Sequence, residues 1–224
     1  MKTFKVMAAL LSYPEADMIA ALPELESALL REGALTGGEL DGVRQLMREM
    51  VGEDLLDLQE RYVGLFDRSR GLSLHLFEHV HGDSRDRGTA MIELAGLYRQ
   101  RGLMIARAEL PDYLPLFLEY LSHLDREEAR STLGDVAHIL APIRQRLAKR
   151  GSSYGSAIAA LLRLAEYIPA SDDALANEEP DDTPEAIDRV WEEAAVTFGG
   201  PDAAAEAAQP CTRAAAMVER MNAR

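Results

Sequence analysis

Apolar residues recur every three to four positions along most of this chain, the spacing of one face of an α-helix. The clearest stripe, over residues 126–149, consists of Leu133, Val136, Ala137, Leu140, Ile143 and Leu147. Strand-like alternation is nearly absent, and the good helix formers Ala, Leu, Glu and Arg are abundant. The pattern predicts eight helices, over residues 3–11, 15–31, 39–50, 54–66, 84–102, 112–125, 126–149 and 153–168.

Each apolar stripe needs a partner face, and short connections favour antiparallel neighbours. We therefore expect an all-α fold, a single bundle of about eight helices. The composition agrees with this, because 47% hydrophobic and 28% charged residues in a chain of 224 are typical of a soluble globular domain.

The pattern changes near residue 171. The segment SDDALANEEPDDTPEA, residues 171–186, is acidic, contains two prolines and has almost no large apolar side chains. A short amphipathic piece with Ile187, Val190 and Trp191 follows it. Such a composition is typical of a solvated linker. We expect a helical domain over residues 1–170, and an acidic linker with a largely flexible C-terminal tail over residues 171–224.

The formal net charge of -14 makes some partners poor candidates. Phosphate backbones and anionic lipids repel such a chain, so we expect no nucleic acid and no membrane insertion. No stretch approaches the ~18 consecutive apolar residues of a membrane-spanning helix. The apolar run over residues 6–11 is too short for a signal peptide, and no cleavage site follows. The single cysteine, Cys211, fits a reducing compartment, so we expect a cytoplasmic protein.

The connection over residues 67–83, DRSRGLSLHLFEHVHGD, holds three of the five histidines and lacks a helical stripe. A long connection between two helices often carries function. His75, Glu78 and His79 match the H-x-x-E-H pattern of zinc hydrolases. A zinc site also needs a third ligand, and His81 does not share the face of His79. We therefore expect no metal, and keep a zinc-dependent hydrolase using these three residues as the alternative.

The polar side chains around this connection are expected to hold it in place through hydrogen bonds and ion pairs. The candidates for this role are Asp67, Arg68, Arg70, His75, His79, His81, Arg85 and Arg87. The arginines have an alternative role, because a guanidinium group also suits an anionic ligand.

A second segment, ELPDYLPLFLEYL at residues 109–121, combines prolines suited to a first helical turn with aromatic residues. Phe117 and Leu121 are expected to pack in the core, whereas Glu109, Asp112, Tyr113 and Glu119 could face a partner. The chain shows no phosphate-binding glycine loop and no Ser/His/Asp or Cys/His arrangement. These observations do not favour an enzyme.

The text of residues 62–88, YVGLFDRSRGLSLHLFEHVHGDSRDRG, strongly resembles the signature of NarJ-type nitrate reductase molybdenum cofactor assembly chaperones, within the wider TorD-like family. Residues 109–121 are similar to the second signature of that family, and DDTPEAIDRVWEEAAVTFG at residues 181–199 is similar to its C-terminal region. One position departs: the family often has Asp-His where this chain has Asp112-Tyr113, so histidine chemistry cannot operate there.

The resemblance implies a TorD-like bundle and a dedicated chaperone without a cofactor of its own. Such a chaperone binds the N-terminal segment of the apo catalytic alpha subunit of respiratory nitrate reductase. It assists insertion of the molybdenum cofactor before membrane docking, so proteins of cofactor biosynthesis are further candidate partners. A third hypothesis is a subunit that itself binds molybdopterin nucleotide through the arginines around Arg85.

On this basis we expect an apolar groove with an acidic rim beside residues 67–88 and the start of the helix at residue 112. Such a groove suits a basic amphipathic helix, and binding should weaken with salt. The candidate apolar anchors are Leu74, Phe77, Val80, Leu110, Leu114 and Leu118. The candidate rim and polar contacts are Glu78, Asp86, Glu109, Asp112, Tyr113 and Glu119.

Overall fold

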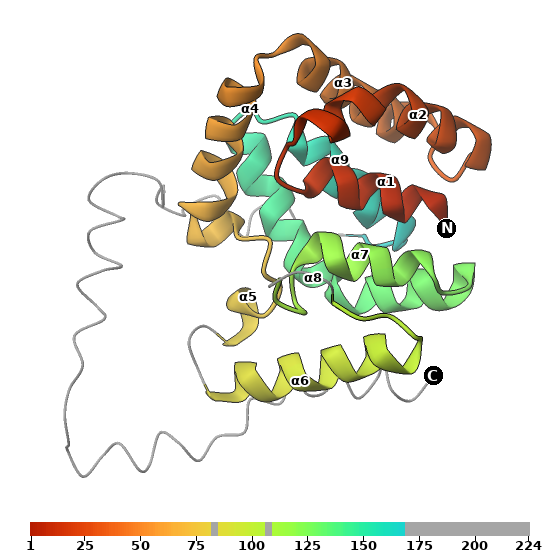
Figure 1. The fold of residues 1–224 in the computed structure, drawn as a ribbon, viewed down its shortest axis with the longest axis vertical. Helices are drawn as coiled ribbons and strands as arrows, with labels where there is room; N and C mark the ends of the chain where they lie inside the picture. The colour runs from red at the N-terminus through yellow and green to blue at the C-terminus, as the bar shows by residue number, and fades with distance from the viewer. Residues whose placement is uncertain (82–84, 106–108, 169–224) are drawn as a thin grey trace, which may run out of the picture.

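The computed structural model describes residues 1–81, 85–105 and 109–168 (Figure 1). Its α-helices are α1 (Lys2–Leu11), α2 (Ala16–Glu32), α3 (Gly37–Gly52), α4 (Leu55–Tyr62), α5 (Glu78–His81), α6 (Arg85–Gln100), α7 (Leu114–Ser122), α8 (Arg126–Lys149) and α9 (Tyr154–Leu164). A π-helical turn, η1 (Val63–Asp67), and a 3-10 turn, η2 (Arg70–Leu72), follow α4. No β-strand occurs in these ranges, which confirms the predicted all-α bundle.

The eight predicted helices correspond to α1–α4 and α6–α9, while the short α5 was not predicted. Local chemistry sets several of the boundaries. The carboxylates of Asp54 and Asp125 accept hydrogen bonds from backbone amides in the first turns of α4 and α8, the usual N-terminal cap. Gly33, with a φ of 64°, ends α2 in the left-handed conformation that glycine adopts at little cost.

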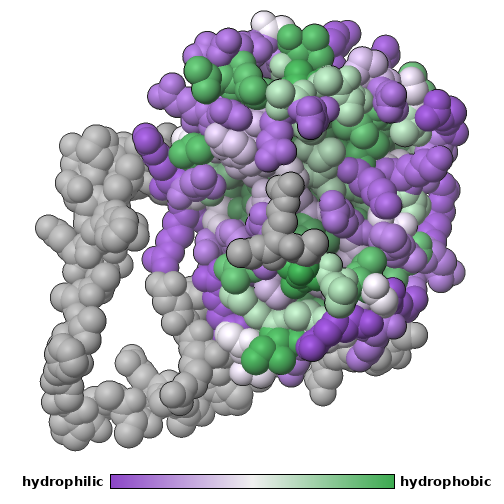
Figure 2. Space-filling model, viewed as in Figure 1, coloured by the Kyte–Doolittle hydropathy of each residue, from purple (hydrophilic) through white to green (hydrophobic). Residues whose placement is uncertain are grey.

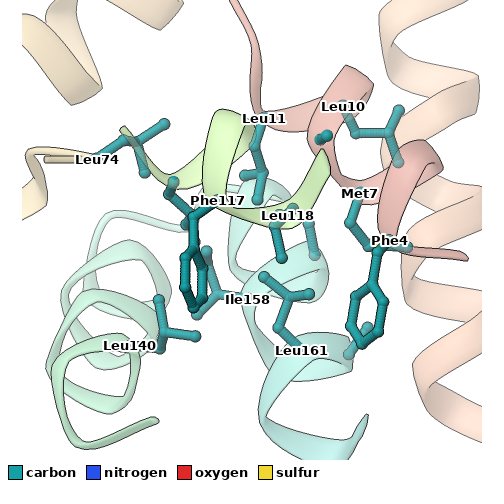
Figure 3. Close-up of a cluster of buried hydrophobic side chains, with 14 of the residues drawn as sticks. Phe4, Met7, Leu10, Leu11, Leu74, Phe117, Leu118, Leu140, Ile158 and Leu161 are labelled. Atoms are coloured by element: carbon teal, nitrogen blue, oxygen red, sulfur yellow. The ribbon is translucent and has the colours of Figure 1, made fainter. Parts of the chain in front are cut away.

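The core lies where α1, α7, α8 and α9 meet. In the folded structure, α1 packs against α7, and α9 packs against both α8 and α3. Figure 3 shows side chains from these helices pointing toward one another. Those labelled there on the four helices are Phe4, Met7, Leu10, Leu11, Phe117, Leu118, Leu140, Ile158 and Leu161, all fully buried. Each such burial contributes roughly 1.5–3 kcal/mol of transfer free energy.

Helix α6 lies along one end of the bundle, below α7 and α8 in Figure 1. The Tyr98 ring packs against Tyr120 of α7, with centroids 4.9 Å apart, and its hydroxyl donates to the carbonyl of Pro111 at 2.8 Å. Arg101, just after α6, forms an ion pair with Glu128 of α8. These contacts hold the helix against the bundle beside the start of α7.

Across the described residues, no helix combines the length and apolar character that crossing a membrane requires. The predicted acidic linker and tail lie outside the described residues from residue 169 onward. The division of the chain at residue 170 therefore stays a prediction.

Candidate functional site

The connection after α4 folds back onto the start of α7. The amide of Leu76 donates to the carbonyl of Asp112 at 3.0 Å, and the amide of Leu114 donates to the carbonyl of Leu74 at 2.8 Å. These bonds form an isolated β-bridge between His75 and Tyr113. The two segments that carry the family signatures are thus in direct backbone contact, although 37 residues separate His75 from Asp112.

Asp112 is the polar centre of this contact, and its side chain is fully buried. Its carboxylate accepts a hydrogen bond from the amide of Phe77 at 3.2 Å. It lies 3.3 Å from Nδ1 of His75 and 3.5 Å from the guanidinium of Arg87. Arg87 also pairs with Glu78 at 3.1 Å. Because a buried charge is costly unless it is paired, these partners explain how a carboxylate is tolerated here.

The two histidines of this connection respond in opposite ways to their surroundings. The hydrogen bond with Asp112 raises the pKa of His75 above its ordinary value, outweighing the opposing effect of burial. Burial lowers the pKa of His79, whose Nε2 lies 2.8 Å from the carbonyl oxygen of Ser73. Because a carbonyl only accepts, Nε2 of His79 carries the proton. Both rings are therefore engaged in holding the connection.

This geometry does not support a zinc site at His75, Glu78 and His79. Helix α5 begins at Glu78, so His75 lies before the helix and the two histidines are not one helical turn apart. The pattern of the zinc hydrolases requires that spacing on one helix. In the part of the chain that the structure describes, no three His, Cys, Asp or Glu side chains are grouped so that they could hold a metal.

Tyr113 connects this contact to α1 and α4. Its ring lies against that of His75, with centroids 5.4 Å apart, and its hydroxyl lies 2.9 Å from the hydroxyl of Tyr62. Tyr62 in turn donates to the carbonyl of Leu11 at 2.8 Å. Burial raises the pKa of both tyrosines, so their hydroxyls stay protonated and available for these bonds.

An open cleft of about 390 Å³ lies beside Tyr113, between the start of α7, the end of α1 and the chain after α6. We call it the α7 cleft. It is lined by Ser12, Met104, Ile105, Glu109, Tyr113, Pro115, Leu116 and Glu119. Two of these described lining residues are acids and none is a base. Met104 is 86% exposed and the neighbouring Leu110 is 41% exposed, and Figure 2 shows hydrophobic side chains at the surface on the face that carries α6 and α7.

The structure places the residues predicted to bind a client in different surroundings. Glu109, Tyr113 and Glu119 line the α7 cleft, and Leu110 is exposed next to it. Those buried beneath the surface are Leu74, Phe77, Asp112, Leu114 and Leu118. Their side chains are buried and so offer no surface to a partner in this structure. Val80 is partly buried against the core, and Glu78 pairs with Arg87.

The residues predicted to hold the connection in place also differ in their surroundings. His75, His79 and Arg87 make the contacts described above. Asp67, Arg68 and Arg70 are exposed on or beside the π-helical and 3-10 turns. The side chains of His81, Arg85 and Asp86 lie outside the described residues. The nucleotide-binding hypothesis based on Arg85 therefore stays a prediction.

Sequence reasoning missed five residues of the α7 cleft, namely Ser12, Met104, Ile105, Pro115 and Leu116. One signal could have indicated two of them. Met104 and Ile105 are large apolar residues placed after the helix-ending Gly102, so they belong to no helical stripe that would bury them. Nothing in the pattern indicated Ser12, which is far away in the sequence.

Comparisons with known proteins point to one family. The family model described as "Nitrate reductase delta subunit" matches residues 15–160. Over 196 residues the chain is 43% identical to the nitrate reductase molybdenum cofactor assembly chaperone NarJ of Escherichia coli (strain K12), covering 86% of this chain and 83% of that protein. It is 41% identical over 201 residues to the probable assembly chaperone NarW of the same strain, covering 88% and 84%. It is 31% identical over 173 residues to the probable assembly chaperone NarJ of Bacillus subtilis (strain 168), covering 74% and 89%.

Proposed function

The chain belongs to the nitrate reductase delta subunit family of molybdenum cofactor assembly chaperones, and we propose that it binds the N-terminal segment of the apo catalytic alpha subunit of respiratory nitrate reductase. It acts in maturation of the enzyme and is not itself an enzyme. In this proposal it holds the alpha subunit until the molybdenum cofactor is inserted and the complex docks at the membrane. Because these steps precede docking, we place the protein in the cytoplasm.

The observation that carries the proposal is the chemistry of the α7 cleft. Its lining combines the apolar Met104, Ile105 and Leu116 with the carboxylates of Glu109 and Glu119. An apolar floor beside acidic side chains suits a segment that presents apolar side chains on one face and basic side chains at its edge. The net charge of -14 adds a long-range attraction for a basic segment.

The buried residues of the predicted site have an indirect part in this proposal. Leu114 and Leu118 anchor α7 in the core, and Asp112 fixes the backbone immediately before it. They hold the outer face of α7, with Leu116 and Glu119, in position. Direct contact with the client is assigned to the lining residues and to Leu110. Leu114→Asp would place an unpaired carboxylate in the core. A loss of peptide binding by this variant could therefore come from unfolding and would not identify a contact with the client.

The proposal is tested by calorimetric titration of the full chain with a synthetic peptide of the alpha subunit N-terminus. A scrambled peptide of the same composition separates sequence recognition from simple charge attraction. We expect saturable binding of the native peptide only, and weaker binding by Leu116→Ala. Leu56→Ala is the matched control, because Leu56 is 73% exposed on α4 and does not line the cleft.

Two results would contradict the proposal. Equal binding of both peptides would mean that the chain recognises charge and not a segment. No binding of either would remove the N-terminal segment as the client. Zinc analysis of the same sample addresses the alternative, because a zinc hydrolase requires stoichiometric metal.

A further inference from the structure

A second cavity lies where α3 and α8 begin and α9 ends, and it shares no lining residue with the α7 cleft. Its volume is about 170 Å³. We call it the arginine pocket, and it is lined by Met1, Ala34, Leu35, Thr36, Arg126, Arg130, Arg163, Leu164 and Glu166. Three guanidinium groups against one carboxylate give the lining a formal charge of about +2, in a chain whose net charge is -14.

The placement of Arg126 and Arg130 runs against the usual rules for helices, whereas Arg163 lies in the last turn of α9, where a cation is favourable. Arg126 is the first residue of α8, and Arg130 follows four positions later. A cation at the positive end of a helix is unfavourable, and like charges four residues apart repel one another. Residues that break a local rule without an evident gain often belong to functional sites.

Helix α3 adds further positive character. Thr36 precedes its first residue and lines the pocket, and the Thr36 side chain makes no capping hydrogen bond to the backbone amides at that end. The N-terminal end of a helix attracts anions through these amides and through the helix dipole. The N-terminal end of α3 and three guanidinium groups therefore meet at one cavity, whereas Asp125 already caps the N-terminal end of α8.

Carboxylates of the chain satisfy only part of this capacity. Glu166 pairs with Arg130, and Glu39 lies 3.8 Å from Arg163. A guanidinium group carries five N–H donors, so single contacts leave donors for a further anion. Among the described residues, no carboxylate pairs with Arg126. The buried side chains of Leu35 and Leu164 form the apolar part of the pocket wall.

We propose that the arginine pocket binds a phosphate group. A phosphate dianion accepts several charge-assisted hydrogen bonds at once, and guanidinium groups bind it in bidentate fashion. The pocket volume of about 170 Å³ is well above the ~10–15 Å³ that a cavity needs in order to hold one water molecule. This space suits a single phosphate group, either free or at the end of a small ester whose remainder stays outside.

The test is calorimetric titration of the full chain with inorganic phosphate and, separately, with glycerol phosphate, at constant ionic strength with chloride as the balancing anion. We expect saturable one-to-one binding of at least one of them. Arg126→Gln and Arg163→Gln should each weaken it about tenfold. Arg48→Gln is the matched control, because it removes one positive charge from α3 at a site outside the pocket.

A fourth variant separates ligand binding from simple ion pairing. Glu166→Gln removes the carboxylate that competes for Arg130, so phosphate should bind more tightly than in the unmodified chain. If the arginines served only to pair with their carboxylates, neither anion would bind and Glu166→Gln would change nothing. That result, or an equal loss of binding in Arg48→Gln, would overturn the proposal. Binding of the ester alone would identify an esterified phosphate as the ligand.

Discussion

The hydroxyl groups of Tyr62 and Tyr113 lie 2.9 Å apart and join the end of α4 to the residue that precedes α7. Since Tyr62 donates to the carbonyl of Leu11, its oxygen accepts from Tyr113. A directed chain of hydrogen bonds thus runs from the wall of the α7 cleft to the end of α1.

Tyr113→Phe tests the contribution of this hydroxyl pair. The substitution keeps the ring against His75 but removes the bond to Tyr62, so we expect a loss of about 1–2 kcal/mol in the free energy of unfolding. Urea denaturation measures it. Tyr13→Phe is the control, because its ring is 43% exposed, and it should stay within about 0.5 kcal/mol of the unmodified chain. Equal effects of both substitutions would contradict a specific role for the pair.

Asp112→Asn should destabilise the fold by about 2–3 kcal/mol. The amide group of asparagine carries no charge to offset Arg87 and His75, and its NH₂ replaces one of the two acceptor oxygens that face Phe77, Arg87 and His75. Glu78→Gln is the comparison, because it removes the other partner of Arg87 but leaves the buried carboxylate in place. We expect it to cost less than about 1 kcal/mol. A larger loss from Glu78→Gln would show that Asp112 is not the main support of this contact.

His75 should make stability depend on pH. Its pKa is raised in the folded state by Asp112, so its contribution is fully present below the unfolded pKa of about 6.5 and is lost as pH rises through the folded pKa. The cost of His75→Gln should therefore be larger at pH 6 than at pH 8.5. The pKa of His79 is lowered in the folded state. The loss of stability caused by His79→Gln should therefore be smaller at pH 6 than at pH 8.5. Urea denaturation at both pH values checks the two signs, and equal costs for His75→Gln at both would contradict the first.

Gly42 lies in the contact between α3 and α9, where a Cβ atom would be 2.9 Å from Oγ of Ser156 and 3.0 Å from its Cβ. Gly42→Ala should therefore destabilise by about 1–3 kcal/mol through overpacking, although alanine normally favours a helix. Gly96→Ala, in α6, meets no atom within 4 Å and should stabilise by up to about 1 kcal/mol. Combining Gly42→Ala with Ser156→Gly should recover part of the loss. Stabilisation by Gly42→Ala alone would mean that the helices separate easily.

The carboxylates of the α7 cleft should control the salt dependence of client binding. The double variant Glu109→Gln, Glu119→Gln should weaken peptide binding at low salt and flatten its dependence on sodium chloride, because exposed charges are screened. Glu24→Gln with Glu93→Gln removes the same charge outside the cleft and serves as the control. If both double variants behaved alike, attraction would come from the net charge and not from the cleft.

The hydrophobic pattern was sufficient to predict the bundle. A stripe such as Leu133, Val136 and Leu140 shows which face of a helix is buried, since burial of one face imposes the helical period on the sequence. Asp54 and Asp125 also mark helix starts, because capping is local. The pattern failed at α5 and the π-helical turn, where the chain is held by contacts with α7 and by its own short turns.

The sequence by itself therefore determined the helices, their buried faces and, through two signature segments, the family. Only the tertiary structure decided which polar groups meet. From its sequence position, Asp112 would be predicted to be a surface carboxylate at a helix start. It is buried in the structure because His75, Phe77 and Arg87, from a distant segment of the chain, lie against it. The α7 cleft likewise combines Ser12 with Met104 and Leu116. Periodicity reports the environment of one residue along its own helix, whereas a site depends on pairs that long-range packing brings together.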